Sequence, residues 1–121
     1  MKLRAHTDAE LGQAQLKGLA AHMTEKRREV TERVENLEQQ MAIKDDCSHA
    51  DAADAASAQE NRLRARAMVE QHRQVIMEID AAFRRLEIGS YGVSETTGEP
   101  IDHERLRLVP WARVGTDDKE L

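Results

Sequence analysis

The sequence predicts a mainly all-α protein, in which a long antiparallel coiled-coil hairpin precedes a small module and a C-terminal helix. Two segments of nearly equal length, roughly 8–45 and 52–88, carry apolar residues at alternating steps of four and three. Charged residues make up 34% of the chain and aromatic residues only 2%, a composition typical of long exposed helices. The short polar stretch between the segments favours a hairpin and a monomer, with a parallel dimer as the alternative.

The first arm is predicted to begin at Thr7-Asp8-Ala9-Glu10, which fits a capping box. The polar cluster at 44–49 then predicts a turn. Between these limits the seam of the coiled coil runs through Leu16, Ala20, Met23, Arg27, Val30, Val34, Leu37 and Met41.

The second arm resumes the heptad pattern, and Gly89 supplies a helix end. Its seam comprises Ala65, Val69, His72, Ile76, Ile79, Phe83 and Leu86. At its start, within a tip near 46–56, the stretch 51–56 places Asp51 and Asp54 one helical turn apart among small alanines. The alternative for these acids is that one caps the helix and the other is solvated.

Four segments together resemble the DksA/TraR family of transcription factors. They are Asp51-x-x-Asp54-x-Ala56, the stretch 79–92, Gly98-Glu99-Pro100-Ile101, and Val109-Pro110-Trp111-Ala112. The resemblance runs from about 51 to 119 and implies a hairpin domain over 1–88, followed by a degenerate zinc-finger-like module over 89–121.

The resemblance also implies a function. Family members bind bacterial RNA polymerase directly, without binding DNA, and insert the coiled-coil tip through the secondary channel toward the active site. By position, Asp51 and Asp54 would be the acids and Ala56 the small residue of the RNA polymerase-binding tip. The alternatives are a coiled-coil adaptor that binds another protein or itself, and a competitor that occupies the channel without regulating initiation.

The chain departs from the family at the zinc site. The four cysteines of the family correspond here to Ser94, Thr97, Gly115 and Asp118. This set offers at most one ordinary zinc ligand, so we predict no structural zinc and no other cofactor. The module must then be held by packing, and the predicted packing residues are Phe83, Leu86, Ile88, Tyr91, Ile101, Leu106, Leu108 and Trp111.

A second departure concerns ppGpp, the nucleotide of the stringent response. The basic positions that help to bind it in the family match Glu78, Val109 and Lys119, and a further one matches Gln71. Because only Lys119 keeps its charge, we predict a weak or absent ppGpp response.

The remaining features limit the function classes. A net charge of −5 argues against a protein that grips nucleic-acid phosphates, and the basic run 62–66 is interpreted as a solvated face. The single cysteine, Cys47, indicates a reducing, cytoplasmic compartment, and a redox role for it is not favoured. No apolar run approaches the roughly 20 residues of a membrane span, and no catalytic constellation is present, so neither a membrane protein nor an enzyme is expected.

Overall fold

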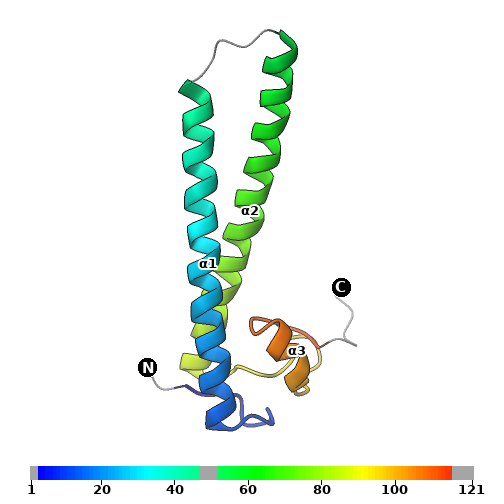
Figure 1. Cartoon of the computed structure of the whole chain (residues 1–121). Coiled ribbons are helices and arrows are strands. Elements are labelled where there is room, and N and C mark those ends of the chain that lie inside the picture. Colours follow the sequence, from blue (N-terminus) through cyan, green and yellow to red (C-terminus); the bar gives the residue numbers. More distant parts are fainter. Residues whose placement is uncertain (1–2, 47–51, 116–121) are drawn as a thin grey trace. The chain divides into compact units, whose positions relative to one another are not determined.

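The computed structural model describes residues 3–46 and 52–115 and, at 43–46 and 52–54, the backbone alone. The chain forms helices α1 (Gln13–Asp46), α2 (Ala52–Ile88) and α3 (His103–Leu108), as Figure 1 shows. Within the described ranges the extended structure is limited to isolated bridges, from Ala5 to Tyr91 and from Val93 to Pro100. The prediction of a mainly α-helical fold with two long helices and a short closing helix is therefore confirmed.

The chain divides into two compact units, one formed by 27–76 and the other by 1–26 together with 77–121. In the first unit the C-terminal part of α1 and the N-terminal part of α2 run antiparallel (Figure 1). Val30, Val34 and Val69 are buried along this seam, as the heptad pattern predicts. The predicted boundary between the hairpin domain and the module lies at 88/89, where the sequence pattern changes. In the structure, residues 77–88 pack in the same unit as the module. No described helix is long and apolar enough to cross a membrane.

The second unit has a core of aliphatic side chains from the other ends of α1 and α2 and from the module. Its buried residues are Leu16, Leu19, Met23, Ile79, Ala82, Leu86, Tyr91, Ile101, Leu106 and Ala112. Two predicted packing residues are wrong, because Ile88 is 70% exposed and Leu108 is 81% exposed. Each is the last residue of its helix, where the chain leaves the helical path and the apolar periodicity no longer sets the direction of the side chain.

The predicted start of the first helix is also wrong, since α1 begins at Gln13 and not near Thr7. The side chain of Gln15 accepts a hydrogen bond from the N–H of Gly12 at 2.9 Å, which is the reciprocal half of a capping box. The carbonyl of Gly12 accepts the first helical bond, from the N–H of Leu16 at 3.0 Å. The capping function thus lies five residues later than the Thr7–Glu10 pattern indicates.

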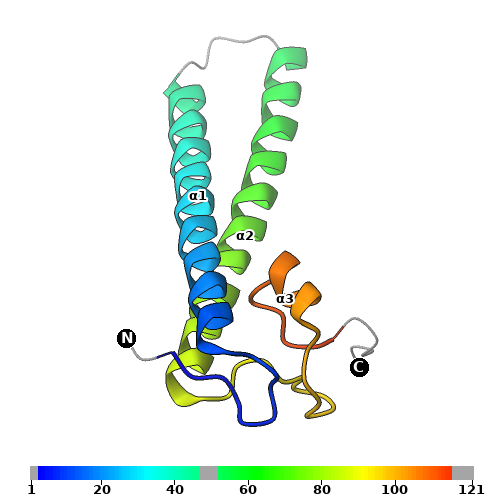
Figure 2. The same ribbon diagram turned by 60° about the horizontal axis from the view of Figure 1, so that its bottom comes forward.

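Two residues of the segment 3–11 make tertiary backbone bonds. The N–H of Arg4 donates to the carbonyl of Leu86 at 2.8 Å, and the N–H of His6 donates to that of Tyr91 at 2.7 Å. Figure 2 shows this segment, in dark blue, beside the chain that leaves α2. Leu86 lies in the last turn of α2, where carbonyls lack helical partners, so the segment satisfies one of them.

Candidate functional site

The candidate tip lies at the start of α2. Because this helix begins at Ala52, the backbone of Asp54 falls in its first turn, where the helix dipole favours negative charge. The side chain of Asp54 and the whole of Asp51 and Cys47 lie outside the described residues, while Ala56 is exposed. The assignment of Asp51, Asp54 and Ala56 to a polymerase-binding tip therefore stays a prediction.

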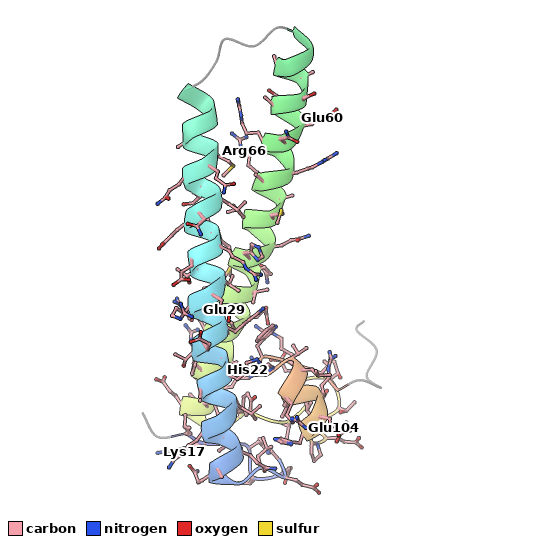
Figure 3. The ribbon with its side chains drawn as sticks, viewed as in Figure 1. Lys17, His22, Glu29, Glu60, Arg66 and Glu104 are labelled. Atoms are coloured by element: carbon pink, nitrogen blue, oxygen red, sulfur yellow. The ribbon has the colours of Figure 1, made fainter. Side chains whose placement is uncertain are left out.

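The stretch of α2 that follows the tip is exposed on several sides. Arg64 and Arg66 are exposed, as is Glu60. Figure 3 shows Glu60 and Arg66 in the N-terminal half of α2. Leu63 is 58% exposed and lies within the same turn and a half. The interpretation as a solvated basic face thus holds for Arg64 and Arg66, whereas Arg62 is half-buried. Long side chains surround an otherwise narrow, alanine-rich helix here.

The first loop of the module is a closed turn at Ser94, whose side chain and backbone are buried. Its hydroxyl oxygen accepts from the N–H of Thr96 at 3.2 Å and from that of Thr97 at 3.4 Å. Its carbonyl accepts from the N–H of Gly98 at 2.9 Å, and Gly98 takes the left-handed conformation with φ 73°. The turn is thus shaped by hydrogen bonds to one hydroxyl-bearing residue.

These positions do not fit a structural zinc ion. The hydroxyl oxygens of Ser94 and Thr97 already accept backbone N–H groups, the latter from Glu99 at 3.3 Å. Gly115 has no side chain to offer, and Asp118 lies outside the described residues. Over the described part of the chain, no three His, Cys, Asp or Glu side chains gather closely enough to hold a metal ion.

An ion-pair cluster joins the second loop of the module, which follows α3, to α2 and to the first loop. Arg113 donates to both carboxylate oxygens of Glu78, from Nε at 2.7 Å and from Nη2 at 3.4 Å. Its Nη1 donates to Glu95 at 3.2 Å, and the N–H of Glu95 donates to the carbonyl of Arg113 at 2.9 Å. The hydrogen bond to Glu78 is the main reason that the pKa of Arg113 is raised. Arg113 is not among the site residues predicted from the sequence, because its partners are remote along the chain.

The chain before Arg113 is anchored by two further hydrogen bonds. The hydroxyl of Tyr91, which is 1% exposed, donates to the carbonyl of Pro110 at 2.6 Å. Arg85 donates from Nη2 to the carbonyl of Trp111 at 3.2 Å. Burial raises the pKa of Tyr91 far above its ordinary value and lowers that of Arg85. Both groups therefore tie the returning chain to α2 and its end.

Comparison with solved structures and with characterised proteins identifies the family. The structure resembles that of transcription factor DksA2 from Pseudomonas aeruginosa with a TM-score of 0.74 at 32% identity, covering 85% of this chain and 78% of that one. The chain belongs to the DksA/TraR family. It is also 42% identical over 73 residues to RNA polymerase-binding transcription factor DksA of Caulobacter vibrioides, which is 60% of this chain and 51% of that protein.

A more distant relative is general stress protein 16O of Bacillus subtilis, which is 36% identical over 62 residues, 51% of this chain and 38% of that protein. No protein-family model matches the chain. The chain spans about half the length, 51%, of the DksA protein that it matches in sequence. Family membership therefore accounts for the fold, and the activity must be argued from this chain's own residues.

The positions that the resemblance matches to ppGpp contacts can be placed in the structure in part. Glu78 is held in the ion pair with Arg113, and the N–H of Val109 donates to the carbonyl of Arg105 at 2.8 Å. Gln71 is an exposed uncharged side chain, and Lys119 lies outside the described residues. None of Gln71, Glu78 and Val109 carries a cation, and the weak or absent ppGpp response stays a prediction.

Proposed function

We propose that this protein regulates transcription initiation by binding bacterial RNA polymerase directly. It enters the secondary channel and presents its tip acids near the active site, without binding DNA. The observation that carries the proposal is the likeness to DksA2 over 85% of the chain, combined with Asp51-x-x-Asp54-x-Ala56 at the start of α2.

The physical properties of the hairpin support this role. At about 1.5 Å per residue, the part of α2 from 52 to 76 extends about 37 Å, enough to reach deep into a channel. Alanines keep its end narrow, and Ala56 is exposed. A carboxylate brought close to a catalytic magnesium ion or a basic loop changes the local charge balance without performing chemistry itself. The net charge of −5 disfavours direct DNA binding.

The protein works in the cytoplasm as a monomer, and its module contains no zinc. The donor set supports the last point, because Ser94 and Thr97 bind backbone amides with their hydroxyl groups. Its ppGpp response is weak or absent, since Glu78 is paired with Arg113. In transcription titrations we expect ppGpp to change initiation equally with and without the protein, and strong synergy would contradict this part of the proposal.

The deciding experiment is in vitro transcription by purified bacterial RNA polymerase on a promoter that forms short-lived open complexes. The native protein is compared with Asp54→Asn and with Glu60→Gln. The control removes the same charge from an exposed position on the same helix. Binding to the polymerase is measured in parallel.

We expect the native protein and the Glu60→Gln control to change initiation, and Asp54→Asn to bind the polymerase without doing so. If the native protein binds but changes nothing, it is a competitor for the channel. If it does not bind at all, the proposal is wrong and the coiled-coil adaptor becomes the better account.

A further inference from the structure

We infer that an ion-pair clip centred on Arg113 takes the place of the structural metal in the module of this protein. The clip consists of Arg113 with its carboxylate partners Glu78 and Glu95. It accounts for how a finger-like frame without metal ligands keeps its two loops together. The inference concerns stability, and it stands or falls independently of polymerase binding.

The clip joins the same two loops that a metal would join. The family's metal positions fall at Ser94 and Thr97 in the first loop and at Gly115 and Asp118 in the second. Glu95 follows the first of these directly, and Arg113 lies two residues before Gly115. The loops are linked twice here, by the Arg113–Glu95 ion pair at 3.2 Å and by a backbone hydrogen bond between the same residues at 2.9 Å.

The clip also reaches the helix, which a four-ligand metal site within the two loops does not. Glu78 belongs to α2 and is approached by two nitrogens of Arg113, at 2.7 and 3.4 Å. A bidentate pair of this kind is stronger and more directional than a single contact. The side chain of Glu78 is 25% exposed against 48% for Glu95, so the helix contact is screened less and carries more of the stabilisation.

Each loop is also shaped by hydrogen bonds that do not involve the clip. In the first loop the hydroxyl of Ser94 accepts two backbone N–H groups. In the second, the N–H of Ala112 donates to the carbonyl of Val109 at 3.0 Å, and Tyr91 holds the carbonyl of Pro110. Because other hydrogen bonds already fix both turns, the clip needs only to hold the loops against each other and against α2.

The two kinds of link differ in what breaks them. A zinc–thiolate site is lost to chelators and to oxidation of its sulfur ligands. Ion pairs at partly exposed side chains are indifferent to both, but salt screens them and removal of either charge abolishes them. The module should therefore respond to ionic strength and not to chelation.

The test is thermal unfolding of the full chain, followed by the fluorescence of Trp111, the only tryptophan. The native protein is compared with Arg113→Gln, Glu78→Gln, the double variant, and Arg113→Lys, which keeps the charge but not the bidentate geometry. Arg84→Gln is the matched control, because it removes the same charge from an exposed position near Glu78 on α2. Bound zinc is measured by elemental analysis, and melts are repeated with EDTA.

We expect no bound zinc and no effect of EDTA on the native Tm. Arg113→Gln and Glu78→Gln each lower Tm by about 2–4 °C relative to the Arg84→Gln control. The Tm of the double variant is no lower than that of the less stable single variant, because both substitutions remove the same ion pair. The gap between native and Arg113→Gln shrinks as salt rises from about 0.1 M to about 1 M.

Two results would overturn the inference. One is stoichiometric zinc whose removal lowers Tm. The other is a Tm for Arg113→Gln and Arg113→Lys that equals that of Arg84→Gln. If Arg113→Gln does not fold, Arg113→Lys and Glu78→Gln give the same comparison at smaller perturbation.

Discussion

Replacement of Tyr91 by phenylalanine tests the bond that fixes the returning chain of the module. The Tyr91 hydroxyl is 2.6 Å from the carbonyl oxygen of Pro110, and both residues are fully buried. Tyr91→Phe keeps the ring and its packing, so the change is confined to one donor. No cavity larger than an oxygen atom results.

The expected loss follows from the burial of the acceptor. A hydrogen bond contributes about 0.5–1.5 kcal/mol net, and a buried carbonyl left without a donor costs about 1–3 kcal/mol. Because the Pro110 carbonyl has no access to water in the native state, the upper part of this range applies. We expect the free energy of unfolding to fall by about 2 kcal/mol, a large share of the roughly 5–15 kcal/mol typical of a domain.

Urea denaturation followed by Trp111 fluorescence measures this loss, and the pH dependence provides a second readout. Burial raises the pKa of Tyr91 in the folded state, so the unfolded chain releases its phenol proton first as the pH passes about 10. The native protein then loses stability above that pH, and Tyr91→Phe loses less. A loss below about 0.5 kcal/mol at neutral pH, or equal alkaline slopes, would refute the reasoning.

Three further substitutions test backbone features. Gly92 has φ 96°, and an added Cβ would lie 2.8 Å from the Cβ of Ala9, whereas Gly98 has φ 73° and open space around it. Gly92→Ala should therefore destabilise by more than about 2 kcal/mol and Gly98→Ala by about 1 kcal/mol; equal denaturation midpoints would contradict the clash. Gln15→Ala removes the bond to the Gly12 N–H and should lower stability by about 0.5–1 kcal/mol, with helical signal by circular dichroism as the check.

The helices show what a sequence pattern can and cannot predict. The second arm was predicted over 52–88 and α2 occupies Ala52–Ile88, because its limits are set locally. Gly89 takes φ 83°, and the N–H groups of Gly89 and Ser90 both donate to the carbonyl of Arg85. The start of α1 could not be found this way, since the Thr7 pattern is overridden by backbone bonds to residues near 86 and 91.

The candidate site likewise has features that the sequence predicts and features that it does not. The prediction of a module without zinc needs the sequence alone, because the positions that the resemblance matches to zinc ligands, among them Ser94, Thr97 and Gly115, lack thiolates. The link between the loops could not, since Arg113 and Glu78 are 35 residues apart and no periodicity connects a loop arginine to a helix carboxylate. The buried Leu19 was missed for a smaller reason, which is that the heptad register pointed to the neighbouring Ala20.

The two compact units have a consequence for the evolution of this protein. Because the unit at 27–76 is inserted between the two parts of the other, it begins and ends within helices that continue across the junction. A matched deletion of one heptad from α1 and one from α2 preserves the seam on both and shortens the insertion by about 10 Å. Insertions of a heptad lengthen it equally. The length of the unit at 27–76 can thus change in fixed increments during evolution or by design, while the module keeps its own sequence.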